Sequence, residues 1–285
     1  MSAAATSLQT SVRQVLEQAS VRLRASDSAA LDAQLLLAHA LGKSRTWLYA
    51  WPEAAVDAAA LQGFHGLLEA RAAGTPVAYL LGKQEFWSLT LQVSPAVLIP
   101  RPDTELLVQT ALELGPAGPA LVADLGTGSG AIALALASER PQWQLHATDL
   151  SGAALAVAAR NREALGLANV RMLSGSWCEP LPAGDYDLIL SNPPYIAADD
   201  VHLAQGDVRF EPRSALVAHN AGLADIVILA AQALPRLKRA GWLLIEHGWQ
   251  QGPAVRALLQ QDGYVQVQTR LDAGGRERMT MGCKP

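Results

Sequence analysis

The sequence predicts an α/β protein in which a doubly wound, mainly parallel sheet follows a small all-α helical bundle. Residues 1–82 carry apolar side chains at helical spacing, among them Leu8, Val12 and Val15. From Ala120 onwards, short apolar segments such as "ALVADL", "QLHATD" and "YDLILS" alternate with alanine- and leucine-rich helical segments. This alternation is typical of the strands and helices of a parallel sheet.

The chain is expected to divide into three segments, namely 1–82, 83–105 and 106–285. The helical first segment closes on "GTPVAYLLG", with Thr75 as the expected N-cap, Pro76 at the first helical position and Gly82 just past the helix end. The second contains "QEFWSLTLQVS", whose apolar residues predict a short hairpin that links the two larger parts. The third ends in "YVQVQTRLDAGGRERMTMG", which predicts two antiparallel strands around a Gly-Gly turn.

Composition excludes several classes of protein. Half of the 285 residues are hydrophobic, which favours a sizeable core, yet no run reaches the roughly 18 apolar residues of a membrane span. The start lacks the pattern of a secretory signal, and Cys178 and Cys283 are too far apart for a disulfide framework or a thiolate metal cluster. A net charge of −4 gives no overall attraction to nucleic acid and leaves only a local basic patch open. We expect a cytoplasmic protein without a bound metal and without direct contact to nucleic acid or membrane.

A glycine loop, "VADLGTGSGAIALALA", follows the first expected strand of the sheet and opens a helix. Gly126, Gly128 and Gly130 allow a sharp turn and a close approach to a ligand, while the helix start offers free N–H groups. Asp149 ends the next strand, where an acid can bind both ribose hydroxyls. It could instead cap the following helix, although Ser151 can serve as that cap. The loop predicts an adenosine cofactor and leaves S-adenosylmethionine and NAD both open.

The stretch "SNPPYI" follows the strand "YDLILS", and two prolines cannot continue a sheet ladder. Asn192 therefore falls at the carboxyl end of a strand, where open α/β sheets bind ligands. The side-chain carbonyl of Asn192 and the backbone carbonyl of Pro193 can hold a planar NH2 group, and Pro194 stiffens the pair. Tyr195 can stack on the flat group. A proline-rich turn is the alternative. As a clamp, the stretch favours methylation of a planar NH2 group, catalysed by alignment, over NAD chemistry. Adenine, cytosine and glutamine each carry such a group.

Several segments together resemble the bacterial release factor N5-glutamine methyltransferases, the PrmC or HemK family: "GKQEFWSLTLQVSPAVLIPRPDTELLV", "DLGTGSGAIALALA", "SNPPYI", "FEPRSALVA" and "IEHGWQQG". The resemblance covers nearly the whole chain. It implies a class I S-adenosylmethionine-dependent methyltransferase, with a Rossmann-like seven-stranded sheet. The implied reaction methylates the side-chain amide nitrogen (N5) of the glutamine in the Gly-Gly-Gln motif of class-1 peptide chain release factors. A ribosomal-protein glutamine and, less favoured, adenine N6 in DNA are the alternative targets. A cofactor-binding regulator without catalysis is the alternative from a different class, and the intact clamp beside the glycine loop speaks against it.

The resemblance also implies site residues. S-adenosyl-L-methionine is expected on a set of loop and strand-end residues: Asp124, Gly126, Thr127, Gly128, Ser129, Gly130, Asp149, Ser176, Trp177 and Asn192. The substrate glutamine is expected on Asn192, Pro193, Pro194 and Tyr195. Asp124 would hold the loop and the methionine end of the cofactor, although a solvated strand end is the simpler interpretation. Trp177 would pack against adenine, or serve only as core, and Ser176 stands where the family commonly has an acid.

Four charged residues fit two interpretations. Arg101 and Glu105 of "IPRPDTE" either line the pocket or form a structural ion pair with one another. Glu211 and Arg213 of "FEPRSAL" carry the same ambiguity. The N-terminal helices are expected to dock the release factor.

Overall fold

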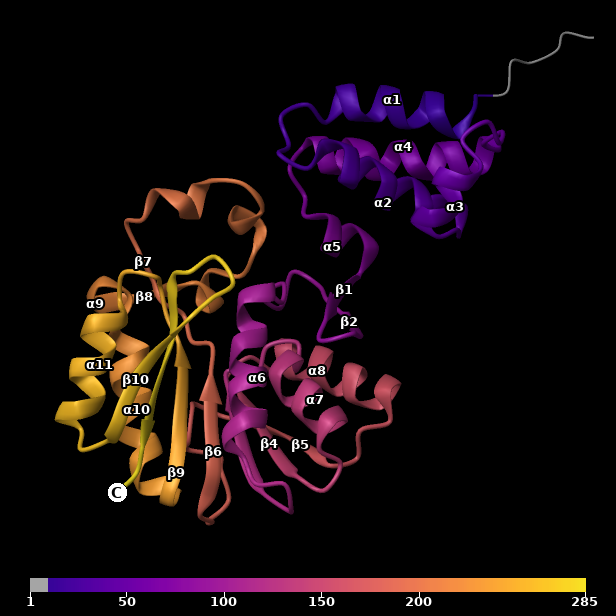
Figure 1. Ribbon diagram of the computed structural model, residues 1–285. Coiled ribbons are helices and arrows are strands. Elements are labelled where there is room, and N and C mark those ends of the chain that lie inside the picture. The colour runs from indigo at the N-terminus through magenta and orange to yellow at the C-terminus, as the bar shows by residue number, and fades with distance from the viewer. Residues whose placement is uncertain (1–9) are drawn as a thin grey trace, which may run out of the picture. The chain divides into compact units, whose positions relative to one another are not determined.

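The computed structural model describes residues 10–285 and divides the chain into two compact units (Figure 1). The first unit ends at Gly82, and the second comprises Lys83–Pro285. Each has a core of its own, built from buried apolar side chains, so burial of apolar surface stabilises each of them. Leu8, which is expected in the first helix, lies outside the described residues.

The first unit is helical throughout its described part. Its helices are α1 (Val12–Arg22), α2 (Ala29–Leu41), α3 (Arg45–Ala50), α4 (Ala58–Ala72) and α5 (Val77–Leu81). Ser11, Ser44 and Asp57 precede α1, α3 and α4, and each side chain accepts a hydrogen bond from a backbone N–H of the first turn. Such caps satisfy donors that a helix start otherwise leaves free, which explains why the helices begin there.

The start of α5 differs from the expectation. Pro76, and not Thr75, occupies the N-cap position, and the helix begins one residue later, at Val77. The reason is the backbone of Pro76, whose ψ of 137° is extended although its φ of −56° suits a helix. Gly82 ends the helix in the left-handed conformation, as expected.

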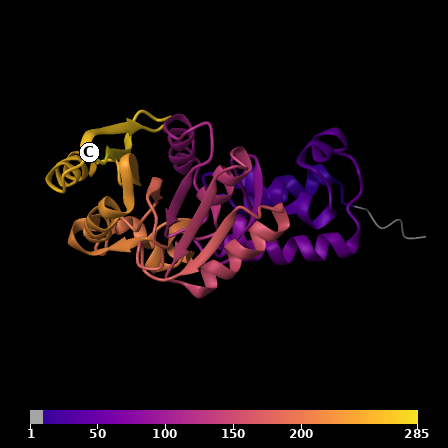
Figure 2. The ribbon, with the colours of Figure 1, turned by 90° about the horizontal axis from the view of Figure 1, so that it is seen from below.

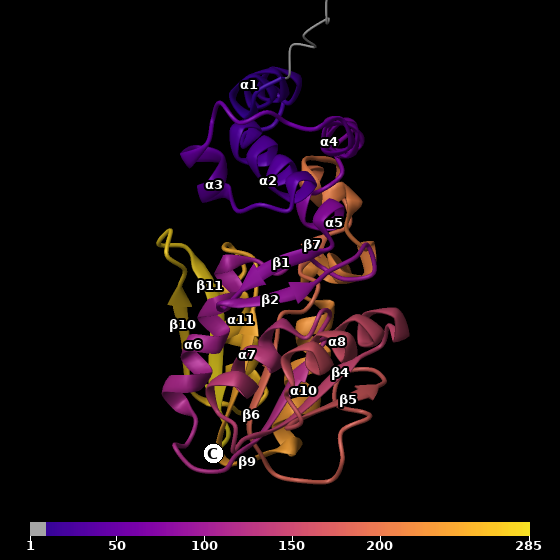
Figure 3. The ribbon, with the colours of Figure 1, turned by 90° about the vertical axis from the view of Figure 1, so that its right-hand side faces the viewer.

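The second unit opens with an antiparallel hairpin of β1 (Lys83–Phe86) and β2 (Leu89–Gln92), whose arrows point in opposite directions in Figure 3. Trp87 and Ser88 form the turn, both with positive φ, a conformation that usually selects Asn-Gly. The Trp87 backbone N–H donates to Glu105, and its indole N–H donates to Glu139. These two hydrogen bonds attach the strained turn to the body of the unit.

The sheet of the second unit has the strand order β10-β11-β9-β6-β3-β4-β5. Its strands are β3 (Leu121–Leu125), β4 (Gln144–Asp149), β5 (Val170–Ser174), β6 (Tyr186–Ser191), β9 (Leu237–Glu246), β10 (Val265–Leu271) and β11 (Glu277–Cys283). All neighbours pair in parallel except β11, which is antiparallel to β9 and to β10. The predicted fold class is confirmed: a mainly parallel seven-stranded sheet with an antiparallel C-terminal hairpin.

Helices cover both faces of this sheet. They are α6 (Glu105–Leu114), α7 (Ala131–Glu139), α8 (Gly152–Leu165), α10 (Ala224–Arg236) and α11 (Gly252–Gln261). Along β6, Leu188 and Leu190 share a core with α6 and α7, whereas Ile189 shares the other core with α10 and α11. In Figure 2 the strands lie between these two groups of helices. The central strands β3 and β6 are therefore buried on both faces, which explains why they read as apolar runs, whereas the edge strand β10 is mostly exposed.

Short elements extend from the carboxyl edge of the sheet. They are η1 (Pro102–Thr104), β7 (Ile196–Ala197), η2 (Val201–Ala204), η3 (Asp207–Phe210), η4 (Arg213–Ala215), β8 (Val217–Ala218) and α9 (His219–Gly222). β7 pairs with β8 in parallel directly after Tyr195. Gly222 has a φ of +83°, and a Cβ atom there would lie 2.1 Å from the Tyr195 carbonyl oxygen. Only glycine fits this approach, which seats the chain after the two prolines.

One buried amide joins the hairpin to the glycine loop. The Asn161 side chain, on α8, accepts from the Gln92 N–H (2.7 Å) and donates to the carbonyls of Gln92 (3.0 Å) and Ser129 (2.9 Å). Asn161 is buried, so these backbone groups have little access to water as a replacement partner.

We expect Asn161→Ala to lower the free energy of unfolding by about 2–4 kcal/mol, because three hydrogen bonds are lost and buried backbone groups remain unsatisfied. Urea denaturation of the full chain measures this loss. The exposed Arg160→Ala substitution, on the same helix, is the control and should cost under about 0.5 kcal/mol. Equal stabilities of the two variants would contradict the bridging role of Asn161.

Candidate active site

The register of the sheet brings the ends of several strands together. Leu125, the last residue of β3, is the register partner of Ser191 on β6 and of Thr148 on β4. Ser191 is in turn opposite Ile245, and its hydroxyl donates to the Leu125 carbonyl over 2.7 Å. Because all four strands run parallel, the residues that follow them share one edge. β3 lies between β4 and β6 at the switch point of the strand order, where open α/β sheets bind ligands.

The glycine loop begins at this edge. Gly126, Gly128 and Gly130 have φ values of +73°, +57° and +87°, which residues with a Cβ rarely adopt. The N–H groups of Gly126 and Thr127 both donate to the Thr148 carbonyl over 2.9 Å. At Gly130, a Cβ would lie 2.9 Å from a methyl carbon of Leu134. The three glycines are thus required for the loop to turn directly into α7.

Asp124, in β3, forms hydrogen bonds with the glycine loop and is fully buried. One carboxylate oxygen accepts from the Thr127 hydroxyl (2.6 Å) and the Ala133 N–H (3.2 Å). The other, Oδ1, has no hydrogen-bond partner within residues 10–285, and the same holds for the buried hydroxyl of Ser129. Burial raises the pKa of Asp124 to about 6. The alternative of a solvated strand end is therefore wrong.

Asp149 holds the loop from the neighbouring strand. Its Oδ2 accepts from the Gly128 N–H (2.9 Å), and its Oδ1 accepts from the Ser151 N–H (2.8 Å). Ser151 is the N-cap of α8, since its hydroxyl accepts from the Ala154 N–H. The alternative in which Asp149 caps this helix is therefore excluded, and the carboxylate is instead fixed beside the glycine loop.

Trp177 lies on the other side of the loop. Its carbonyl accepts from the Thr148 hydroxyl over 3.0 Å, and its φ of +44° is unusual for a large side chain. The indole ring stands over the loop, because a Cβ on Gly126 would lie 3.1 Å from its Cζ3 atom. The ring also packs against the core shared with α10 and α11, and its contact with adenine stays a prediction. Ser176 is half-buried beside it, and its hydroxyl makes no hydrogen bond to other described residues.

The Asn-Pro-Pro-Tyr segment follows β6 at the same edge. The Asn192 amide nitrogen donates to the Thr104 hydroxyl (3.1 Å), and the Tyr195 hydroxyl donates to Glu246 (3.2 Å). The Tyr195 carbonyl accepts from the Gln251 side chain over 3.0 Å. Pro193 is buried and Pro194 half-buried between these two anchors. Both side chains of the expected clamp are therefore held in place by neighbouring elements.

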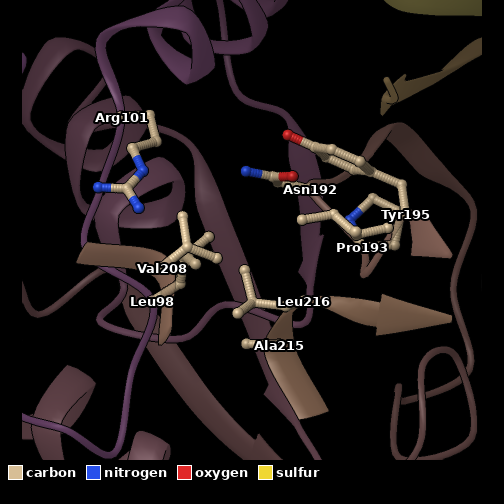
Figure 4. Close-up of a pocket in the computed structure, with 9 residues that line it drawn as sticks. Leu98, Arg101, Asn192, Pro193, Tyr195, Val208, Ala215 and Leu216 are labelled. Carbon is tan, nitrogen blue, oxygen red and sulfur yellow. The ribbon is translucent and has the colours of Figure 1, made fainter. Parts of the chain in front are cut away.

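A pocket of about 150 Å³ opens beside this segment. Figure 4 shows Asn192, Pro193 and Tyr195 on one side of it, with Arg101 and Leu98 across from them. The rest of the wall is apolar: Ile196, Val208, Ala215 and Leu216. A small apolar pocket with a few fixed polar groups suits a short side chain that ends in a polar head.

Arg101 pairs with Glu211, so the alternative in which Arg101 pairs with Glu105 is wrong. Glu211 is buried, and its Oε2 also accepts from the Ile99 N–H over 3.0 Å. Burial raises the pKa of Glu211, and the Arg101 guanidinium opposes this shift. Glu105 accepts from Trp87 in the hairpin, and the exposed Arg213 forms no ion pair with other described residues. Arg101 thus lines the pocket and also forms an ion pair, with Glu211 as its partner.

His247 lies beside the site and is fully buried, and burial lowers its pKa. Nδ1 hydrogen-bonds the Gly248 carbonyl (2.9 Å) and Nε2 the Thr280 hydroxyl (2.8 Å), so both ring nitrogens are used by the fold. Across residues 10–285, no three or more His, Cys, Asp or Glu side chains gather as metal ligands could. In the same described part, no helix has the length and apolar character needed to cross a membrane.

Comparison with known proteins decides the family. The PrmC N-terminal domain matches residues 14–82, and the methyltransferase small domain matches residues 102–237. A release factor glutamine methyltransferase of Salmonella typhimurium is 51% identical over 94% of this chain and 96% of that protein. One of Xylella fastidiosa is 54% identical over 90% of this chain and 93% of that protein. The chain belongs to the release factor glutamine methyltransferase family. The expected class of enzyme, an S-adenosylmethionine-dependent methyltransferase, is confirmed by these matches.

Solved structures agree on the fold. A methyltransferase from Pyrococcus furiosus has a TM-score of 0.53 at 19% identity, over 69% of this chain and 89% of that one. A 16S rRNA methyltransferase from T. thermophilus, in complex with AdoMet and guanosine, has a TM-score of 0.53 at 21% identity, over 71% and 50%. At this level of identity the likeness extends to the fold alone.

Sequence reasoning missed two residues of the methyltransferase site, Thr104 and Glu246. Glu246 ends β9, beside the strand that carries Asn192, as Asp149 ends β4, so an acid at a strand end was the available signal. Burial raises the pKa of Glu246 from 4.5 to about 7, against the opposing effects of Thr104, Tyr195 and Arg278. Thr104 carried no comparable signal, because its contact with Asn192 joins residues 88 positions apart.

We expect the stability difference between the wild type and Glu246→Gln to depend on pH. The folded-state pKa lies above the ordinary value, so folding favours the protonated acid, and this contribution is lost as pH rises through about 7. Wild type should therefore lose up to about 3 kcal/mol relative to the variant between pH 5 and pH 8.

Urea denaturation of both proteins at pH 5, 6, 7 and 8 measures this difference. Asp124 is present in both proteins, so its own titration cancels in the comparison. A difference that stays constant across this pH range would show that Glu246 keeps an ordinary pKa in the fold.

Proposed function

We propose that this protein transfers a methyl group from S-adenosylmethionine to the side-chain amide nitrogen of the glutamine in the Gly-Gly-Gln motif of class-1 peptide chain release factors. The observation that carries the proposal is the Asn192 amide at the wall of a small apolar pocket, with its nitrogen bound to Thr104. Its carbonyl oxygen remains an acceptor for a substrate N–H. The relatives with 51% and 54% identity are named release factor glutamine methyltransferases, which supports a release factor glutamine as the substrate.

The residues around the glycine loop suit S-adenosylmethionine. The unpartnered Oδ1 of Asp124 offers a buried acceptor to an ammonium group, as the methionine end of the cofactor has. Asp149 is fixed where it can accept from ribose hydroxyls, and the Trp177 ring gives a flat apolar surface for adenine. The loop itself contributes backbone and hydroxyl groups of Gly126, Thr127, Gly128, Ser129 and Gly130, and Ser176 adds a free hydroxyl beside the ring. Bound there, the cofactor supplies an electrophilic methyl group.

The protein's contribution to the transfer is alignment. An amide nitrogen is a weak nucleophile, because its lone pair is delocalised into the carbonyl group. Acceptors at Asn192 Oδ1 and the Pro193 carbonyl can hold both N–H groups of the substrate and turn the lone pair toward the methyl group. They also stabilise the positive charge that develops on nitrogen. The Tyr195 ring borders the pocket, and the hydrogen bond from its hydroxyl to Glu246 fixes the ring.

The net charge and the division of the chain into segments are the basis for our proposal on the substrate class and its docking. A net charge of −4 suits a protein substrate better than duplex nucleic acid. We assign docking of the release factor to residues 1–82, a linking hairpin to 83–105 and the methyl transfer to 106–285. Release factors act in translation, so we place the protein in the cytoplasm.

We expect Asp149→Ala to weaken S-adenosylmethionine binding at least about tenfold, because the ribose acceptor is lost and Gly128 loses its partner. Isothermal titration calorimetry of the full chain measures the dissociation constant. Asp185→Ala, which removes an exposed acid before β6, is the control and should leave the constant unchanged. Equal affinities of the two variants would remove Asp149 from the cofactor site.

The decisive test incubates the protein with a purified release factor and S-adenosylmethionine and maps methylation by peptide mass spectrometry. We expect one methyl group on the Gly-Gly-Gln glutamine and at least about a hundredfold slower transfer by Asn192→Ala, since the amide is no longer aligned. A release factor with glutamate in place of that glutamine controls for methylation elsewhere. Methylation of a ribosomal protein in place of the release factor would overturn the proposed substrate.

A further inference from the structure

A chain of buried polar groups extends behind the Asn-Pro-Pro-Tyr segment. The Asn192 nitrogen donates to the Thr104 hydroxyl over 3.1 Å. Burial raises the pKa of Glu246, and the Thr104 hydroxyl, as a side-chain hydrogen-bond donor, opposes this rise. The Tyr195 hydroxyl donates to the same carboxylate over 3.2 Å. Thr104 is 4% exposed and Glu246 is 2% exposed, so solvent does not replace either partner. Both residues that face the proposed substrate are thus connected to one buried acid.

The Thr104 hydroxyl does not serve the helix that it precedes. Thr104 is the last residue of η1 and leads directly into α6, with helical backbone angles (φ −67°, ψ −19°). Its side chain forms no capping hydrogen bond. The hydroxyl instead faces Asn192, whose segment is 88 positions away in sequence. The Thr104 side chain therefore joins two distant segments and takes no part in the hydrogen bonds of the helix start.

The direction of the hydrogen bonds follows from the chemistry of the carboxylate. Above about pH 7 the Glu246 carboxylate is ionised and can only accept, so the single proton of the Thr104 hydroxyl is directed to it. The hydroxyl oxygen is then left to accept, and only the NH2 end of Asn192 can donate to it. The carbonyl end of Asn192 is consequently the end left for a substrate N–H. Besides burial, four neighbouring groups change the pKa of Glu246: Asp103 raises it, whereas Thr104, Tyr195 and Arg278 lower it.

We propose that Thr104 and Glu246 are positioning residues, which fix the carbonyl end of the Asn192 amide toward the substrate and hold the Tyr195 ring beside it. This inference rests on the proposed function, since it concerns methylation of an amide. With the opposite orientation, Asn192 would present its NH2 group to the NH2 group of the substrate, and two donors would face one another. The energetic cost of the buried Glu246 is retained because it selects between these two orientations.

The test compares Thr104→Val, which removes the hydroxyl at nearly constant shape, with Thr104→Ser, which retains it. Thr110→Val is the matched control: Thr110 lies on α6, is fully buried and accepts from Arg270, away from the pocket. Steady-state methylation of a purified release factor gives kcat and KM for each variant. Calorimetry with S-adenosylmethionine gives the cofactor affinity, and thermal unfolding gives the stability.

We expect Thr104→Val to lower kcat about 10- to 100-fold, with KM and cofactor affinity within about threefold of wild type. Thr104→Ser should restore kcat to within about threefold, and Thr110→Val should leave it unchanged. Glu246→Gln should lower kcat at least about fivefold, because a neutral amide oxygen is a weaker acceptor for the Thr104 and Tyr195 hydroxyls than a carboxylate oxygen. The proposal is overturned if Thr104→Val keeps the wild-type kcat, or if serine fails to restore it.

The outcomes separate this inference from the proposed function. Wild-type protein that leaves the release factor unmethylated overturns the function itself. Methylation by wild type and by Thr104→Val at equal rates leaves the function intact and removes the positioning role. A fall in stability without a fall in kcat would likewise assign Thr104 a structural role and reject the inference.

Discussion

The pairing of β3 with β6 is the constraint on which the rest of the site depends. Leu125 and Ser191 are register partners, and the Ser191 hydroxyl donates to the Leu125 carbonyl across the two strands. The glycine loop begins after the first residue, and the Asn-Pro-Pro-Tyr segment begins after the second. A shift of one residue would move every side chain of β6 to the other face of the sheet. The glycine loop and the Asn-Pro-Pro-Tyr segment are therefore adjacent, because one pair of strands fixes the position of both.

Two buried acids lie in or next to the β3–β6 strand pair and give the site its electrostatic character. Asp124 lies within β3 and Glu246 ends β9, and each has one carboxylate oxygen without a partner in the described structure. Burial raises the pKa of both, to about 6 and about 7. A core built for stability alone would avoid such groups. Their concentration at one edge of the sheet is typical of a functional site, where stability is exchanged for chemistry.

Local sequence signals predicted much of this site and could not predict the rest. The strand alternation, the three glycines and the two prolines are each contained in a few consecutive residues, so their structural consequences could be inferred directly. The choice between Asp149 and Ser151 as helix cap was left open, because both spacings are compatible with a cap. The structure resolves it through hydrogen bonds to Gly128 and Ala154.

The contacts that sequence reasoning missed join distant segments. Arg101 pairs with Glu211, 110 positions away, although Glu105 offered a nearer acid on the same segment. Asn192 binds Thr104 across 88 positions. The partners are chosen by how the segment before α6 packs against the residues that follow β6 and β7, and no periodicity in a single sequence encodes that packing. Element type is thus a local property, whereas the choice of partner is a property of the whole fold.

Asn161 has a consequence for how this protein can vary. One side chain satisfies backbone groups of the hairpin and of the glycine loop at the same time, so it fixes the spacing between the two segments. An inserted or deleted residue in either segment would move a carbonyl out of reach of an amide that cannot follow, because it is buried on α8. Lengths of the hairpin and of the loop are therefore coupled: chains that keep this asparagine should tolerate indels elsewhere on the surface, and in neither of these two places.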